Sequence, residues 1–218
     1  MMTRATAVLI VFLGGFIIML LEIIGARYLA KDFGGSFYVW VSQIGVVMIA
    51  LAAGYYLGGA LADRYQHVSF LVWLLVPAGI ITFAIPDFSP RLIDALITRH
   101  PMNRDIPRLW QKLDPALGSA LVFLLPCMVL AALGPCMIRL AVGSLSHVGR
   151  SSGLIIAAST VGSIAGVFVS GYVLIDSLSL SSIFRAMGGL TVMLGVLCLW
   201  VDRMSGAASA VAQEPGSL

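Results

Sequence analysis

Charged side chains are scarce in this 218-residue sequence: they make up 11% of the residues, whereas 60% are hydrophobic. The mean hydropathy of +1.01 lies far outside the usage of soluble globular domains. The net charge is only +3 and its basic residues are dispersed, which excludes the basic patch of a nucleic-acid-binding protein. The composition therefore predicts a membrane protein whose main partner is the lipid bilayer, with no nucleic-acid partner.

Cysteine is also rare, and its placement argues against metal chemistry. Cys127, Cys136 and Cys198 lie in apolar stretches with no His or carboxylate at ligand spacing. Buried, unreactive thiols are favoured over a disulfide or a metal site. Neither a Ser/His pair nor paired carboxylates occur within the apolar runs, so we expect no metal, no cofactor and no enzyme active site.

The sequence lacks the alternating segments of about ten residues that a membrane β-barrel requires, so only helices are expected to cross the bilayer. The apolar runs that can cross about 30 Å of hydrocarbon lie near Thr6–Tyr28, Val39–Leu61, Ser69–Ile85, Ala116–Leu140, Gly153–Leu174 and Ser181–Val201. The first run is about twice the length of a signal-peptide core, so we interpret it as a retained span. The predicted fold class is an all-α, polytopic membrane bundle of six transmembrane helices.

The connections are short except for residues 86–115, which mix basic and acidic side chains. Helical apolar spacing within this insertion predicts one or two short amphipathic helices at the membrane interface. A solvated loop with frayed turns is the alternative. Residues 1–204 would then form one membrane domain, and the small, polar tail over 205–218 is expected to be disordered.

Glu22 is the acidic residue that lies well inside an apolar run. A carboxylate there costs about 2–3 kcal/mol on insertion scales, so it should face a partner or a wet cavity. Arg27 is five residues away, roughly 140° around a helix, and is expected to end the span by snorkelling. The remaining candidate partners are Gln43, Tyr55, Thr160, Ser42 and Tyr56. A cation or proton site and a structural hydrogen-bond anchor both fit this pattern.

Two prolines, Pro126 and Pro135, interrupt the fourth run. Each removes a backbone donor and frees a carbonyl one turn earlier, so the helix should be kinked or partly unwound near LGPCM. Broken helices line the binding sites of transporters, although a packing kink explains the same residues. In the fifth run, Gly162, Gly166 and Ser170 form a small-residue stripe that should bury against another helix.

The second run ends in GGALADR, which closes at Arg64. Gly54 and Gly58 form a small-xxx-small pair that lets helices approach closely. Asp63 is expected to accept hydrogen bonds from the free amides at the start of the third span. Arg139 lies near the same boundary, where pairing with Asp63 or snorkelling would satisfy it. A simple helix end with a snorkelling arginine is the alternative for Arg64.

GGALADR resembles the G-x-L-a-D-R loop between the second and third spans of major facilitator transporters, of which six spans would be one half. That loop is cytoplasmic in the family, so the resemblance implies cytoplasmic N- and C-termini in the inner membrane. The closer resemblance is to the integral-membrane region of the bacterial fused major-facilitator and spermidine-synthase-like proteins. It rests, in order, on EIIGARYLA, FGGSFYVWVSQIG, AAGYYLGGALADR, FLLPCMVLAALGPCMIRLA and GLIIAASTVGSIAGVFVSGYVLI.

The fused proteins carry a soluble aminopropyltransferase-like domain with a Gly-rich loop for S-adenosyl substrates. No G-x-G-x-x-G follows a strand-like segment in this sequence, so we expect no aminopropyl transfer by this chain. The resemblance implies a transporter-like or scaffolding subunit linked to polyamine chemistry, with a separate soluble synthase-like chain as partner. The alternative is a half-transporter that homo-oligomerises to move a small cationic solute.

Overall fold

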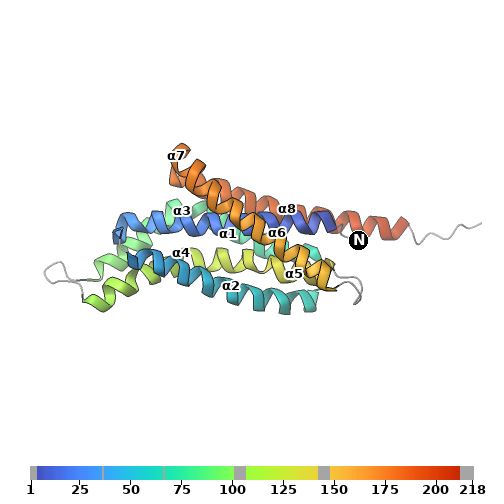
Figure 1. Ribbon diagram of the computed structural model, residues 1–218, viewed down its shortest axis with the longest axis horizontal. Helices are drawn as coiled ribbons and strands as arrows, with labels where there is room; N and C mark the ends of the chain where they lie inside the picture. The colour runs from blue at the N-terminus through green and yellow to red at the C-terminus, as the bar shows by residue number, and fades with distance from the viewer. Residues whose placement is uncertain (1–3, 36, 66, 101–106, 142–147, 212–218) are drawn as a thin grey trace, which may run out of the picture.

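The computed structural model describes residues 4–35, 37–65, 67–100, 107–141 and 148–211, and no strand occurs among them. The helices are α1 (Arg4–Phe33), α2 (Phe37–Tyr65), α3 (Val72–Thr98), α4 (Arg108–Ala131), α5 (Leu133–Ala141), α6 (Val148–Val169), α7 (Ile175–Ser177) and α8 (Leu180–Val211). A 3₁₀ turn over Val68–Leu71 leads into α3, and a π-helical turn over Ser170–Leu174 joins α6 to α7. The long helices lie side by side in an elongated bundle, and the end of α8 extends past the other helices (Figure 1).

Six stretches are long and apolar enough to cross a membrane, which confirms the predicted number of spans in an all-helical chain. They are Ala5–Phe33, Phe37–Tyr65, Val68–Thr98, Arg108–Leu140, Val148–Ser177 and Leu180–Arg203. Each exceeds the length of about 20 residues that a spanning helix needs. The structure therefore supports a multi-pass membrane protein.

The third span differs from its predicted boundaries. The helix α3 does not end at Ile85 but continues through Pro86 and Pro90 to Thr98. Ile85 and Ile93 are buried on its packed side, so tertiary contacts hold the helix together despite the lost backbone donors. The predicted insertion over 86–115 is therefore wrong as a unit: its first part belongs to α3 and its last part to α4. Residues 101–106 lie outside the described residues.

Two helix ends also differ from expectation. Arg27 is exposed but does not end its helix, because α1 continues to Phe33. Gly34 follows with φ of 81°, a left-handed conformation that glycine adopts readily and that commonly terminates helices. At the other end of the chain, α8 runs to Val211, so the expected disordered tail is helical over 205–211. Residues 212–218 lie outside the described residues.

The bundle is built from three closely packed helix pairs, α1 with α6, α3 with α8, and α2 with α4. Each pair contains glycines at which an added Cβ would collide with the backbone of the neighbouring helix. These are Gly162 and Gly166 against Phe12 and Phe16, Gly79 and Gly188 against one another's helices, and Gly54 against Met128. The small-residue stripe predicted in the fifth span therefore packs against α1, as expected for membrane helices.

The centre of the bundle is an aromatic and aliphatic core. The rings of Tyr28 and Phe184 meet edge to face with centroids 5.3 Å apart, and Phe123 lies 5.9 Å from Phe184. The Ser89 hydroxyl donates its single proton to the Ile85 carbonyl at 2.6 Å. In its 2.8 Å bond with Tyr28 it must therefore accept, and the Tyr28 hydroxyl is the donor. This contact ties α1 to α3 and gives the buried phenol a partner.

Candidate functional site

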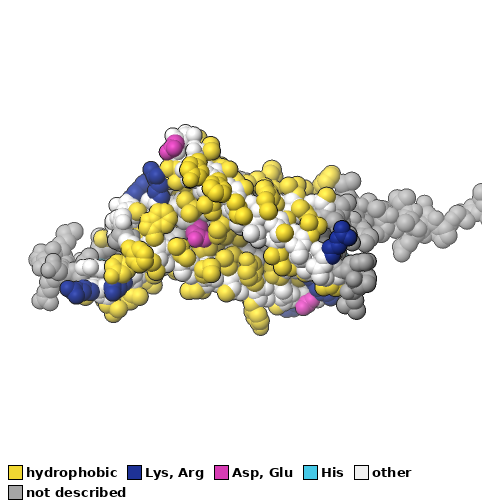
Figure 2. All heavy atoms as spheres, in the orientation of Figure 1, with side chains coloured by type: hydrophobic (Ala, Val, Ile, Leu, Met, Phe, Trp, Pro, Cys, Tyr) yellow, Lys and Arg dark blue, Asp and Glu magenta, His cyan; other side chains and the backbone are white. Residues whose placement is uncertain are grey.

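The spans that contain α2 and α6 are the least covered by other helices. In their most apolar 18-residue stretches only 28% and 17% is buried, against 56% in the span of α1. Since α6 packs on α1 and α2 packs on α4, these two helices flank α1 and α4 on one side, which we call the open face (Figure 1). In the same orientation, hydrophobic side chains cover the middle and basic side chains lie toward the ends (Figure 2). One acidic side chain lies within the apolar area.

A groove of about 490 Å³ opens between α2, α5 and α6. It is lined on these three helices by Tyr55, Gly134, Pro135, Ile138, Arg139, Ile155, Ile156, Ser159 and Thr160. A small hollow shares Tyr55 and Ser159 with the groove and extends it to Gly14, Gly15 and Ile18 of α1. The structure therefore brings together two of the predicted site residues, Tyr55 and Thr160. The Thr160 hydroxyl donates to the Ile156 carbonyl at 3.0 Å, which leaves its oxygen able to accept a further bond.

Glu22 lies one turn after Ile18 on the same side of α1, and it is half-buried. Among the described residues its carboxylate has no hydrogen bond and no ion pair. Glu22 is thus a carboxylate at membrane depth that the described helices leave without a partner.

Gln43 does not line the groove but lies between α1 and α4, one turn from Glu22. Its side chain is fully buried, and its Oε1 accepts a hydrogen bond from the Ser119 hydroxyl at 2.6 Å. Its Nε2 lies against Gly25, one turn beyond Glu22: a Cβ at Gly25 would be 2.5 Å from that nitrogen. The four predicted polar-site residues therefore divide into two sets: Tyr55 and Thr160 line the groove, whereas Gln43 contacts α1 one turn from Glu22.

The fourth span breaks at Ala132, between α4 and α5. Pro135 follows three residues later and cannot donate to the carbonyl of Ala131, which confirms the break predicted near LGPCM. The amide of Ala132 is shared between the carbonyls of Met128 and Val129, both at 3.2 Å, a bifurcated pattern common at helix ends. Pro126 lies inside α4, which continues through it, and Val122 and Cys127 on either side are buried in the core.

The predicted loop motif lies beside this break. Arg139 donates from Nε to Asp63 Oδ1 at 2.8 Å, which is one of the two arrangements expected for Arg139. An added Cβ at Gly58 would collide with Ala132, which places α2 directly against the break. The guanidinium of Arg64 lies over the Tyr65 ring, 5.6 Å from its centroid. The capping role predicted for Asp63 is wrong: α2 continues to Tyr65, and neither the 3₁₀ turn nor α3 has a side-chain cap.

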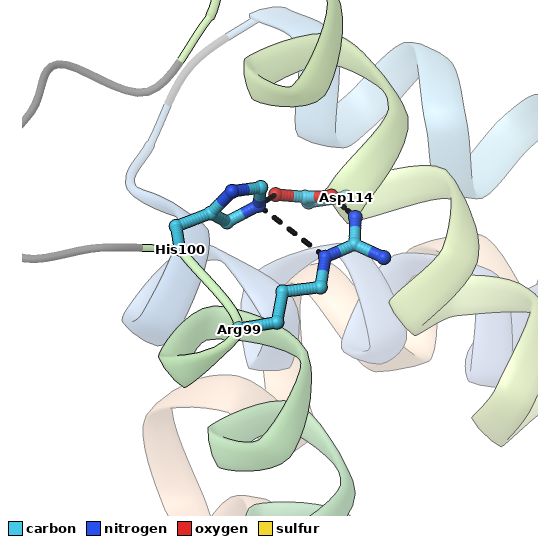
Figure 3. Close-up of polar contacts among 3 residues, drawn as sticks. All are labelled: Arg99, His100 and Asp114. Atoms are coloured by element: carbon cyan, nitrogen blue, oxygen red, sulfur yellow. Dashed lines mark hydrogen bonds and ion pairs between the residues drawn. The ribbon is translucent and has the colours of Figure 1, made fainter.

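Sequence reasoning missed a polar cluster at the other end of α3 and α4. Asp114, 5% exposed, forms an ion pair with Arg99 and accepts a 2.8 Å bond from His100 Nε2 (Figure 3). Since that nitrogen carries the donated proton, it cannot also accept from Arg99 Nε at 3.3 Å. The guanidinium also lies 4.3 Å from the Trp110 ring centroid. The cluster fastens the end of α3 to the start of α4, and the mixed charges of residues 86–115 were its sequence signal.

Within the described ranges, no group of three or more His, Cys, Asp or Glu side chains could hold a metal ion. Cys127, Cys136 and Cys198 are buried, free thiols. Comparison of the chain with protein-family models, with curated proteins and with solved structures finds no match. The resemblance to the fused major-facilitator and spermidine-synthase-like proteins therefore rests on the sequence motifs.

Proposed function

We propose that this chain is a six-helix transport module that binds a small cationic solute at Glu22. The observation that carries the proposal is the half-buried Glu22 carboxylate, one turn of α1 from the hollow at Ile18, with no hydrogen bond or ion pair among the described residues. A carboxylate at membrane depth is costly unless it meets a cation, a hydrogen-bond donor or water. Ionisable groups in such positions are the usual markers of substrate and ion pathways.

The surroundings of Glu22 favour a positive ligand. The hollow that reaches α1 also touches Leu130 and Ala131 at the end of α4. The last carbonyls of a helix carry a partial negative charge, and Pro135 leaves one of them without its usual donor. Tyr55 and Thr160, which carry hydroxyl groups, line the adjoining groove. A cation could therefore exchange its water for carbonyl and hydroxyl oxygens along this path.

One module does not enclose a path, because the groove lies on the face that α2 and α6 leave open, with Glu22 one turn of α1 beyond Ile18 of the adjoining hollow. We propose that a second copy covers this face, so that two carboxylates and two grooves line one cavity. This arrangement is the homo-oligomeric half-transporter expected as an alternative from the sequence. Orientation follows the resemblance, with cytoplasmic termini in the inner membrane. The resemblance also makes a short diamine the first solute to test.

A second candidate function is a membrane subunit that docks a separate soluble synthase-like chain. One observation favours it: α8 continues to Val211, past the apolar stretch that ends at Arg203. We propose that this end of α8 lies outside the bilayer, where a soluble partner could bind. Co-purification of a soluble Gly-rich aminopropyltransferase chain, lost on truncation after Arg203, supports this candidate. Retention of that chain by the truncated protein contradicts it.

Uptake of radiolabelled putrescine by purified protein in liposomes tests the transport proposal. We expect saturable uptake above protein-free liposomes, and its loss in Glu22→Gln. The matched control is Asp176→Asn, because Asp176 is an exposed acidic residue on α7 that lines neither the groove nor the adjoining hollow, and its removal should leave uptake unchanged. Uptake no faster than in protein-free liposomes, with the protein folded and inserted, contradicts the proposal.

A further inference from the structure

The amide nitrogen of Gln43 is the one buried side-chain polar atom without a hydrogen-bond partner in the described part of the chain. The Gln43 side chain is 0% exposed, and the Ser119 hydroxyl holds its Oε1 at 2.6 Å. Buried polar groups in native proteins are almost always paired, so an exception calls for a physical explanation. Because Ser119 donates to the oxygen, this bond leaves the two N–H donors of Nε2 unused.

The free nitrogen faces α1 at the level of Gly25. A Cβ at that position would lie 2.5 Å from Nε2 and 3.0 Å from the Phe123 ring, so only glycine leaves room for the amide. Glu22 is three residues earlier on the same helix, and Cβ atoms at that spacing are about 5–6 Å apart. The two further carbons and the carboxylate of a glutamate can cover this gap by rotation about its side-chain bonds.

We infer that Gln43 is an inner hydrogen-bond partner for Glu22, so that the carboxylate alternates between the open face and an occluded position against Gly25. In the occluded position, Nε2 donates to the carboxylate and both groups are satisfied. In the structure the carboxylate is half-buried and has no hydrogen bond or ion pair among the described residues, and in the outward position it is free to bind a cation. Gln43 is thus a positioning residue, Ser119 orients it, and Gly25 provides the space.

The inference deepens the proposed function and rests on the same carboxylate, but it is tested without solute. The readout is the rate at which the carboxyl-directed reagent N,N′-dicyclohexylcarbodiimide labels Glu22 in membranes, followed by mass spectrometry. A merely structural link from Gln43 to Ser119 would not change this rate. Loss of the occluded position raises it, because the carboxyl group then stays on the open face.

We expect Gln43→Leu to raise the labelling rate of Glu22 by up to about tenfold, the factor that corresponds to about 1.4 kcal/mol for one hydrogen bond to a charged group. Gly25→Ala and Ser119→Ala should also raise the labelling rate of Glu22. The first substitution displaces the Gln43 amide, and the second removes the hydroxyl that orients it. Two controls should leave the rate unchanged. Gly45→Ala adds a methyl group where nothing lies within 4 Å, and Thr191→Val removes a buried hydroxyl that donates only within its own helix.

Gly25→Ala keeps the inference testable if Gln43→Leu fails to fold, since it removes no polar group. Wild-type labelling rates in folded Gln43→Leu and Gly25→Ala overturn the inference, whatever the uptake results. Raised labelling together with a failure of putrescine uptake supports the Glu22–Gln43 contact and contradicts only the proposed transport function.

Discussion

Arg139 donates from its Nε to a carboxylate oxygen of Asp63 across 2.8 Å, which joins the end of α2 to the short helix that follows the break. Both side chains are exposed, at 55% and 69%. Exposed ion pairs contribute only about 0.2–1 kcal/mol. The pair therefore orients α5 against α2 rather than holding the bundle together.

A double-mutant cycle measures this pair. We expect Asp63→Asn and Arg139→Gln each to lower the free energy of unfolding by no more than about 1 kcal/mol, with a coupling energy in the range of exposed pairs. The measurement is reversible unfolding in mixed micelles. A coupling energy several times larger would show that the pair is shielded from water.

The contact of α6 with α1 depends on glycine at position 162. We expect Gly162→Ala to lower the free energy of unfolding by about 1–3 kcal/mol, because the added methyl group overlaps the Phe12 carbonyl. Gly153→Ala on the same helix is the matched control, since nothing lies within 4 Å of its added Cβ. Gly153→Ala should leave the free energy of unfolding unchanged or raise it by up to about 1 kcal/mol, because alanine has a higher helix propensity than glycine. Equal effects of the two substitutions would refute the close approach.

The ion pairs of Asp114 and Asp87 differ in burial and should differ in their contribution to the free energy of unfolding. Asp114→Asn should cost about 1–3 kcal/mol, because it weakens bonds from Arg99 and His100 to a carboxylate that is 7% exposed. Asp87 is 61% exposed and lies 3.3 Å from Arg185, so Asp87→Asn should cost under about 1 kcal/mol. Thermal unfolding compares the two, and Trp110 fluorescence should change only in Asp114→Asn. A larger loss of stability in Asp87→Asn than in Asp114→Asn would contradict the stronger contribution assigned to Asp114.

A second copy on the open face should be detectable by cross-linking. The native cysteines are buried, so a bis-maleimide should react only with an introduced thiol. We expect Thr160→Cys, in the groove, to give cross-linked dimers in native membranes. Trp73→Cys is the control, because Trp73 is 81% exposed on α3, a helix that does not line the groove. Dimers from Trp73→Cys but not from Thr160→Cys would place the interface elsewhere.

The sequence predicts the six spans well, because runs of apolar residues report directly on bilayer thickness. It also predicts the break near Pro135 and the Asp63–Arg139 pair, since both follow from local chemistry at a helix end. It places the end of the third span wrongly, at Ile85. The prolines that follow predict the end of a helix. Only the burial of Ile93 and the bond between Tyr28 and Ser89 show why the helix continues.

The candidate site is less accessible to sequence reasoning. Glu22 stands out because its charge is costly in lipid, and Tyr55 and Thr160 indeed share a groove. The position of Gln43 behind Gly25 depends on how α1, α2 and α4 pack. No periodicity encodes that three-helix contact. The Arg99–Asp114 pair was missed for the same reason, because it joins two helices whose rotation is set by tertiary packing.

Equilibrium binding of radiolabelled putrescine to the purified wild-type protein and to Glu22→Gln is the most direct test of the proposed cation site. We expect saturable binding to the wild type and at least about tenfold weaker binding to Glu22→Gln, because removing one partner of a desolvated charge pair costs about 2–5 kcal/mol. The thermal stability of the variant should match or exceed that of the wild type. Equal affinity of the two proteins, or no saturable binding to the folded wild type, would contradict the assignment of Glu22.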